Sequence, residues 1–291
     1  MTASAHAFVL TLSCRDARGI VHSVSGLLYQ AGCNIIDSQQ FGDADTGLFF
    51  MRVHFSAPPH LRDAGQLELL FEDVRSRFDM QTHFHDLRQR PKVVVAVSQH
   101  GHCLNDLLYR WKAGQMAMDI VGVVSNHATF SDLTRSYSVD FHHLPLAAGA
   151  ASEAKREQED AMFALMRDSG AELLVLARYM QILSPEFCGR IAGRAINIHH
   201  SFLPSFKGAR PYAQAYQRGV KLIGATAHYV TADLDEGPII EQDVERVDHT
   251  MSAADLTAVG QDVESVVLAR AVRWHVEHRI LLNGHKTVVF R

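Results

Sequence analysis

The sequence predicts an α/β protein of two domains. A ferredoxin-like βαββαβ unit is expected over residues 1–88, followed by a mostly parallel, Rossmann-like sheet over residues 89–291. Three observations support this. The length of 291 residues is at the upper limit for one hydrophobic core. The N-terminal part mixes short strand patterns with two amphipathic helical patterns. From Lys92 onward, continuous apolar strands alternate with helices, which is typical of a parallel sheet covered on both faces.

The N-terminal domain is expected to contain four strands and two helices. The strand patterns cover residues 7–14, 34–41, 48–55 and 80–87, and the helical patterns cover 21–31 and 64–78. Gly32 suits a helix end, and the polar residues 42–47 suit a hairpin connection. This order, βαββαβ, is that of a ferredoxin-like unit. The polar stretch that ends at Pro91 is the expected linker.

The second domain is expected to form a sheet with its ligand site along one edge. Apolar strands are predicted at residues 92–97, 119–125, 139–144, 172–177 and 195–198, and a long helix from residue 251 to about residue 279 precedes a last strand at 287–290. In parallel α/β sheets, ligands bind beyond the carboxyl ends of the strands. The loops that follow these strands are therefore where we look for chemistry.

Composition narrows the class of partner. The formal net charge is −4 and the pI about 6.5, so no broad basic field favours nucleic acid or an anionic membrane surface. The four cysteines lack CxxC spacing, which predicts reduced thiols in a cytoplasmic protein. The sequence has no secretory signal pattern, and no apolar run approaches the ~20 residues that cross a bilayer. We expect a small-molecule substrate.

Two separated segments carry candidate catalytic groups. Asn197 and His199 point to the same side of a predicted strand, because side chains alternate faces along a strand. The irregular loop after this strand, with Pro204, Gly208 and Pro211, can form the wall of a pocket. About thirty residues further, a second strand leads into a turn that offers three acids, Asp233, Asp235 and Glu236.

These segments resemble the folate-dependent formyltransferase domain, from Lys92 to the C-terminus. The resemblance is carried by Asn197-Ile198-His199, Leu203-Pro204, Gly208, His228-Tyr229-Val230-Thr231 and Leu234-Asp235-Glu236-Gly237-Pro238-Ile239-Ile240. It implies that Asn197, His199 and Asp235 are the catalytic residues. It also implies that the folate lies against Met180, Gln181, Ile182, Leu183, Val230 and Leu234.

The chemistry of formyl transfer suits these three residue types. Attack on the N10-formyl carbon creates an oxyanion, which the amide of Asn197 and a protonated His199 can stabilise. A carboxylate at Asp235 favours the imidazolium and can orient or deprotonate the nucleophile and relay a proton to N10. We expect neither a metal nor a cofactor besides the folate substrate, and no covalent intermediate.

The loop at 98–104 favours water as the acceptor. The bulky His102 and Cys103 poorly suit a loop that would hold the phosphate of an acceptor through its backbone amides. Four segments resemble the formyltetrahydrofolate deformylases in particular: residues 98–104, 124–127, 177–180 and 199–202. This resemblance implies hydrolysis of 10-formyltetrahydrofolate to formate and tetrahydrofolate, supplying formate for purine synthesis. The alternatives are a transferase acting on an amine acceptor, and a catalytically silent sensor.

The N-terminal domain resembles the ACT domain, as in those deformylases. The segment from Cys14 to Val21 carries this resemblance, with a glycine-containing loop at a helix start. It implies an amino-acid effector, glycine or methionine, and a homo-oligomer formed through these domains. The implied effector-binding residues are Asp16, Gly19, Ile20 and Asn34.

Other polar residues have structural interpretations. Alternation turns His200 away from His199, which favours a packing role, and Asp233 is more typical of a solvated turn acid. The histidine pairs 83/85, 100/102 and 142/143 fall on different elements without a cysteine or carboxylate at zinc-site spacing, so we expect no metal site. The glycines match neither dinucleotide-binding nor P-loop spacing.

Overall fold

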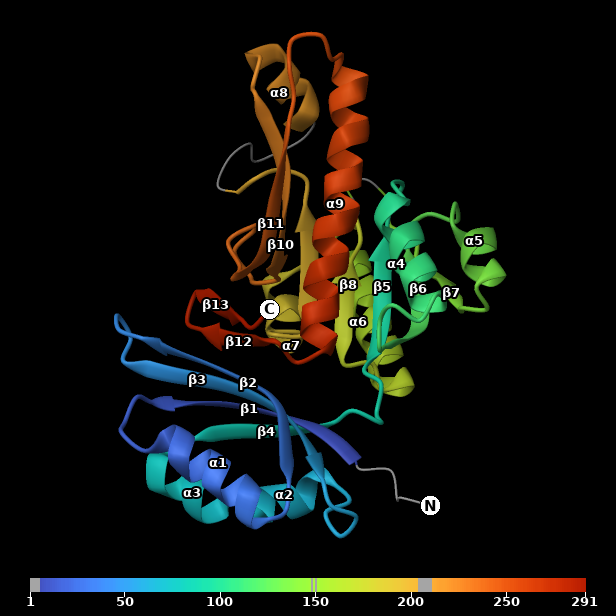
Figure 1. The fold of residues 1–291 in the computed structure, drawn as a ribbon. Helices are drawn as coiled ribbons and strands as arrows, with labels where there is room; N and C mark the ends of the chain where they lie inside the picture. The colour runs from blue at the N-terminus through green and yellow to red at the C-terminus, as the bar shows by residue number, and fades with distance from the viewer. Residues whose placement is uncertain (1–5, 148, 150, 204–210) are drawn as a thin grey trace. The chain divides into compact units, whose positions relative to one another are not determined.

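The computed structural model describes residues 6–147, 149, 151–203 and 211–291, which divide into two compact units (Figure 1). The first unit contains residues 1–90, 277–283 and 287–291, and the second contains residues 91–276 and 284–286. The sequence analysis had assigned the whole C-terminus to the second domain. Pro204 and Gly208, which were predicted to form a pocket wall, lie outside the described residues.

The first unit is a four-stranded antiparallel sheet with helices on one face (Figure 1). Its elements are β1 (His6–Arg15), α1 (Ile20–Gln30), β2 (Asn34–Asp43), β3 (Leu48–Ala57), α2 (Ala64–Leu70), α3 (Glu72–Phe78) and β4 (Gln81–Asp86). The strand order is β2-β3-β1-β4. Alternation along β1 places Phe8, Leu10 and Leu12 in the core between sheet and helices. The ferredoxin-like order predicted from the sequence is confirmed.

The helix predicted at residues 64–78 is two helices that meet at Phe71. Phe71 has φ −88° and ψ −1°, which ends the regular turns of α2 before α3 begins. Its ring is fully buried and packs edge to face on Phe84, with centroids 5.0 Å apart. Periodicity did not reveal the break, because both short helices place apolar residues on the same face.

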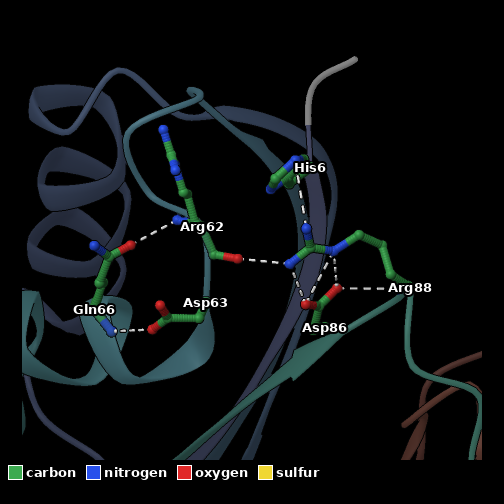
Figure 2. A network of polar contacts seen from close by, with 6 residues as sticks. All are labelled: His6, Arg62, Asp63, Gln66, Asp86 and Arg88. Atoms are coloured by element: carbon green, nitrogen blue, oxygen red, sulfur yellow. Dashed lines mark hydrogen bonds and ion pairs between the residues drawn. The ribbon is translucent and has the colours of Figure 1, made fainter. Parts of the chain in front are cut away.

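A polar network closes the end of this unit (Figure 2). The Arg88 guanidinium donates to the Asp86 carboxylate and to the carbonyl oxygen of Arg62, 2.6 Å away. Hydrogen bonds from Arg88 lower the pKa of Asp86. Asp63 accepts from the backbone N–H of Gln66 and so caps α2. Arg88, which was assigned to the linker, therefore fastens the loop before α2 to the segment after β4.

The C-terminal residues of the chain attach to the same sheet. Arg52 is 4% exposed and donates to the carbonyl oxygens of Glu277 and His278 at 3.0 Å. Gln39 donates to the carbonyl oxygen of Arg291 at 2.8 Å. These residues flank two short strands, β12 (Ile280–Asn283) and β13 (Lys286–Val289). The sequence predicted the last strand, but β12 was missed.

The second unit is a seven-stranded sheet in the order β11-β10-β9-β8-β5-β6-β7 (Figure 1). Its elements are β5 (Lys92–Val97), α4 (His102–Lys112), β6 (Asp119–Ser125), α5 (Ser131–Ser136), β7 (Phe141–His143), α6 (Ser152–Ser169), β8 (Leu173–Leu176), α7 (Pro185–Arg190), β9 (Ala195–His199), α8 (Pro211–Arg218), β10 (Leu222–Tyr229), β11 (Ile239–Arg246) and α9 (Ala253–Val276). β5 to β9 pair in parallel, whereas β10 and β11 pair antiparallel. The mostly parallel sheet is confirmed.

The order of the strands reverses at the centre of this sheet. β6 and β7 extend from one side of β5, and β8 and β9 extend from its other side. The carboxyl ends of β5 and β8 therefore flank a topological switch point, the usual ligand position in such sheets. The long helix α9 packs on β9, β10, β11 and α4.

No helix within the described parts of the chain has the length and apolar character that crossing a membrane would require.

Candidate active site

One pocket collects the residues predicted for catalysis and folate binding. It has a volume of about 310 Å³, within the range of small-molecule sites, and lies along the carboxyl ends of β8 and β9 and the loop between β10 and β11. The predicted residues that line it are Asn197, His199, Asp235, Met180, Gln181, Ile182, Leu183, Val230 and Leu234. Tertiary structure thus brings together three segments that are distant in sequence.

The pairing of β9 with β10 orients Asn197. Asn197 lies opposite His228 in the antiparallel register, and its Nδ2 is 3.2 Å from His228 Nε2. The other ring nitrogen of His228, Nδ1, donates to the carbonyl oxygen of Tyr229 at 2.9 Å. In this tautomer Nε2 carries a lone pair and accepts from the Asn197 amide. The second N–H of that amide is left to donate toward a ligand.

The loop after β10 holds Asp235 in a strained conformation. Asp235 has a φ of +59°, a region that non-glycine residues seldom adopt and that is often found at functional sites. Gly237 fixes the loop against β10, because a Cβ at this position would lie 1.7 Å from the carbonyl oxygen of Tyr229. The N–H of Tyr229 donates to the carbonyl oxygen of Pro238 at 2.9 Å. Only glycine at residue 237 allows this close contact.

Asp235 lies within hydrogen-bonding distance of His199. Asp235 Oδ2 lies 3.1 Å from His199 Nδ1, and Oδ1 lies 3.7 Å from His228 Nε2. Burial raises the pKa of the Asp235 carboxyl, but the hydrogen bond from His199 and the charge of that ring bring the pKa well below its usual range. Asp235 is therefore ionised at neutral pH and is a weak base. It is suited to orient His199 and to stabilise its charged form.

The remaining nitrogen of His199 is left open to the pocket. His199 is 4% exposed, and its Nε2 is buried without a hydrogen-bond partner among the described residues. Because Nδ1 faces Asp235, Nε2 is left to interact with a ligand in the pocket. A buried polar atom without a partner is costly, so its retention indicates a functional role.

Sequence reasoning missed the role of His228. His228 is 3% exposed and contacts both Asn197 and Asp235. One pattern could have identified His228. Antiparallel pairing of residues 195–199 with the following strand places a residue of that strand opposite Asn197.

His200 lies closer to the site than alternation predicted. The rings of His199 and His200 meet edge to face with centroids 5.1 Å apart, because β9 ends at His199 and the chain bends. Burial, followed by the positive charge of Arg178, lowers the pKa of His200 to about 3. His200 is thus neutral at physiological pH. Asp233 is exposed in the loop, as expected for a solvated acid.

Apolar side chains form the rim of the pocket. Met180, Ile182 and Leu234 are 52%, 62% and 58% exposed, although each is large and hydrophobic. The segment that carries the first two is fastened at its end, because buried Glu159 accepts from the N–H and Oγ of Ser184. Exposed apolar groups on a fixed loop are suited to a flat aromatic ligand.

The structure separates the predicted effector-binding residues. Asp16 and Gly19 are exposed in the loop before α1, where Gly19 has a φ of +94°, while the Ile20 side chain is in the core. Asn34 is the first residue of the ten-residue β2. The last residue of β2, Asp43, pairs with the first residue of β3, next to the loop that contains Asp16. The length of β2 puts Asn34 roughly 30 Å from Asp16. One copy of the chain does not bring these residues together.

A second histidine–carboxylate pair lies at the switch point. His102 Nε2 is 2.7 Å from Oε2 of Glu264, which is fully buried in α9. Within the described residues, Cys103 completes a group of three potential metal ligands, one atom from each lying within 4.8 Å of the others. Arg178 Nε lies 3.4 Å from the same Glu264 oxygen, and this positive charge disfavours a cation. All four cysteines of the chain are free.

The comparisons with known proteins agree with this site. Residues 91–272 match the model of the formyl transferase family. The chain is 47% identical over 285 residues to the formyltetrahydrofolate deformylase of Corynebacterium sp. (strain P-1), covering 97% of this chain and 98% of that protein. The chain belongs to the formyltetrahydrofolate deformylase family. The predicted resemblance is thereby confirmed.

Solved structures support the same assignment and distinguish two levels of similarity. The formyltetrahydrofolate deformylase of Burkholderia mallei ATCC 23344 is 53% identical, with a TM-score of 0.90 over 98% of this chain and 100% of that one. Glycinamide ribonucleotide transformylase 1 from Symbiobacterium toebii is 29% identical, with a TM-score of 0.64 over 69% of this chain and 95% of that one. The transformylase thus matches only part of the chain, whereas the deformylase matches nearly all of it.

Proposed function

We propose that this chain hydrolyses 10-formyltetrahydrofolate to formate and tetrahydrofolate, with Asn197, His199 and Asp235 as its catalytic residues. Family membership supports the reaction. The single observation that carries the residue roles is the buried Nε2 of His199, which has no partner among the described residues while Asp235 holds the other ring nitrogen.

The reaction begins with water attacking the formyl carbon. The water oxygen forms a bond to that carbon, and His199 Nε2 accepts a proton from the water. Asp235 stabilises the imidazolium that results, as the carboxylate does in a serine-hydrolase triad. The free N–H of Asn197 donates to the formyl oxygen as negative charge develops on it.

Collapse of the tetrahedral intermediate completes the turnover. The bond between the formyl carbon and N10 breaks, and the imidazolium returns its proton to N10. The second proton of the water leaves with formic acid, which ionises to formate. These steps balance without a metal, a cofactor or a covalent intermediate, so we propose that none takes part.

Formate release without an acceptor is the test of this function. Purified protein is incubated with 10-formyltetrahydrofolate alone, and formate is followed with a formate dehydrogenase assay. Formate should appear in equal amount to tetrahydrofolate. If the folate is consumed only after an amine acceptor is added, the transferase alternative replaces the hydrolase.

The folate is proposed to lie along the apolar rim. Met180, Ile182 and Leu234 provide flat apolar contacts, and Val230 and Leu183 close the inner wall. Leu234→Ala should raise the KM for the folate more than it lowers kcat, because the residue binds substrate and transition state alike. A fall in kcat at constant KM would instead place Leu234 at the reacting centre.

We further propose that the N-terminal unit is an ACT domain that binds glycine or methionine between two copies of the chain. Asp16 and Gly19 belong to one copy, and Asn34, being at the far end of its own sheet, can join them only from a second copy. Light scattering should give a mass above one chain, and Asn34→Ala should weaken effector binding by calorimetry. A monomer that binds the effector with native affinity would contradict this. Supply of formate for purine synthesis in the cytoplasm is part of the same proposal.

A further inference from the structure

The loops at the switch point are bonded to one another and are filled by side chains. Ser98, at the end of β5, donates from Oγ to Oδ1 of Asn126 at 2.7 Å and accepts from the N–H of Met180 at 3.0 Å. Its own N–H donates to the carbonyl oxygen of Arg178 at 3.2 Å. Three loops, after β5, β6 and β8, are thus joined at the position where a sheet of this topology usually holds a ligand.

The start of helix α4 is also covered. A helix N-terminus next to a switch point is a ready anion site because its first N–H groups are unpaired. Here the ring of Phe130 lies on Gly101, so that a Cβ at residue 101 would be 2.3 Å from it. The side chain of His102, the first residue of α4, turns instead to Glu264.

Four side chains, from α4, the loop after β8, α8 and α9, contact one another at the switch point, and we call them the Arg178 cluster. They are Arg178, Glu264, His102 and Tyr212. Glu264 is the centre: it accepts from the Tyr212 hydroxyl, pairs with His102 and lies 3.4 Å from Arg178 Nε. The side chains of Glu264 and Arg178 are 0% and 9% exposed.

Packing connects this cluster to the catalytic residues. The His200 ring lies between the two, with centroids 5.1 Å from His199 and 6.4 Å from Tyr212. Arg178 and His200 line the same pocket as His199. The cluster therefore borders the pocket that contains His199, through Arg178 and through the His200 ring.

Two features of Arg178, its backbone conformation and an unpaired side-chain nitrogen, destabilise the folded chain locally. Its φ is +65°, where glycine is the unstrained residue. Its Nη1 is buried without a hydrogen-bond partner within the described parts of the chain. Both features destabilise the folded chain, which indicates that the side chain serves the reaction rather than the fold.

We propose that the Arg178 cluster determines the acceptor: by filling the switch-point crevice, it admits water and excludes amines, so that the chain hydrolyses its substrate. This inference rests on the proposed function. In the excluded reaction, the amine nitrogen would bond to the formyl carbon, the bond from that carbon to N10 would break, and a proton of the amine would pass to N10. The proton transfers at His199 would be the same in both reactions. The two reactions would therefore differ only in whether the acceptor can reach the formyl carbon.

The test compares two double variants that differ in volume at one position. Arg178→Gly/Glu264→Gln opens the crevice, relieves the backbone at residue 178 and leaves no unpaired buried charge. Arg178→Met/Glu264→Gln makes the same change in charge but keeps the space filled. Each is given 10-formyltetrahydrofolate and glycinamide, a small primary amine, at mildly alkaline pH. N-formylglycinamide and formate are then quantified by mass spectrometry.

The native chain should yield formate almost alone, and so should the methionine variant. The glycine variant should raise the ratio of formylated amine to formate by at least about tenfold, since losing side-chain volume at a specificity pocket commonly changes selectivity by ~10–200-fold. The proposal is wrong if the glycine variant is folded, binds tetrahydrofolate and keeps the native ratio. It is equally wrong if the methionine variant changes the ratio as much.

A single variant covers the case in which the glycine variant does not fold. His102→Ala opens the crevice from α4 and keeps the Arg178–Glu264 ion pair, so a smaller rise in the ratio is expected; an unchanged ratio in this folded variant counts against the proposal. Failure of the hydrolase function itself is recognised separately, because the native chain would then release no formate in the absence of amine.

Discussion

Two histidine–carboxylate pairs lie at the carboxyl edge of the same sheet and differ in what surrounds them. His199 and Asp235 line a pocket, and Nε2 of this histidine is without a partner among the described residues. In the second pair, Glu264 is fully buried and has Arg178 and Tyr212 as further partners besides His102. Both pairs join a histidine to a carboxylate, through Nδ1 of His199 in the first and through Nε2 of His102 in the second.

The difference teaches that a histidine–carboxylate pair can act directly on a substrate only where one of its atoms is left to a ligand. At Asp235 the carboxylate fixes one ring nitrogen and leaves the other for chemistry. At Glu264 the carboxylate is surrounded by His102, Arg178 and Tyr212, so none of its oxygens is left to a ligand. Neutralising the carboxylate of each pair tests this contrast directly, and changes at Asn197 and His200 test the surroundings of the first pair.

Asp235→Asn should have the largest effect. The amide keeps the shape but no longer stabilises the imidazolium of His199, so kcat should fall by ~10⁴-fold, as for the equivalent change in a serine-hydrolase triad. Steady-state formate release measures this, and fluorescence quenching checks that folate still binds. Asp233→Asn, in the same loop but exposed, is the matched control and should change kcat by no more than a few-fold. Comparable losses in the two variants would remove Asp235 from its role.

Glu264→Gln should affect stability rather than chemistry. Breaking a buried ion pair by neutralising one partner leaves Arg178 with an uncompensated charge, which costs ~3–5 kcal/mol. Urea unfolding should show this loss, while the folded variant still releases formate. Glu153→Gln, an exposed glutamate of α6, should change the free energy of unfolding by less than ~0.5 kcal/mol. A Glu264→Gln variant of native stability would show that the cluster is not held by this charge.

Asn197→Ala should reduce the rate less than Asp235→Asn. It removes one oxyanion donor, and the loss of such a donor typically lowers kcat by ~10²–10³-fold. The KM for the folate should stay nearly constant, because the donor acts mainly on charge that develops in the transition state. A rise in KM at native kcat would assign Asn197 to ground-state binding.

His200 should make the folded chain acid-sensitive. Burial and Arg178 lower its pKa to about 3, whereas an unfolded histidine titrates near ~6.5. Between these values the unfolded state binds a proton that the folded state does not. Stability should therefore fall as pH decreases below ~6.5, by up to ~1.4 kcal/mol per pH unit.

His200→Gln should remove this contribution. Denaturant midpoints measured from pH 7 down to pH 4.5 should decline less steeply for the variant than for the native chain. His249→Gln changes an exposed histidine and should leave the native slope in place. If the slopes of the native chain and His200→Gln coincide, His200 is protonated in the fold and its placement beside Arg178 needs another explanation.

Much of the fold follows from local patterns in the sequence. Alternation predicted the strands of the first unit, and apolar runs such as residues 92–97 predicted the parallel strands. The break at Phe71 was missed because it depends on the packing of one ring against Phe84. β11 was not predicted, because it lies at the sheet edge and only its second and third residues are buried, so it has no apolar run.

The candidate site was predictable where residue type and strand position carry the information. Asn197 and His199 share a face by alternation, and the pocket contains them with Asp235. His228 and the Arg178 cluster were not predicted, because their contacts join residues far apart in the chain. His102 and Glu264, for example, are separated by 162 positions.

By itself, the sequence determined the fold class, the family and the candidate residues for the reaction, because periodicity and motif spacing are properties of short segments. Only the tertiary structure decided which of the two histidine–carboxylate pairs faces a pocket. The physical reason is that burial and the number of hydrogen-bond partners depend on how strands and loops from distant segments converge. The way these segments converge determines whether a histidine nitrogen is hydrogen-bonded within the protein or is left for a substrate.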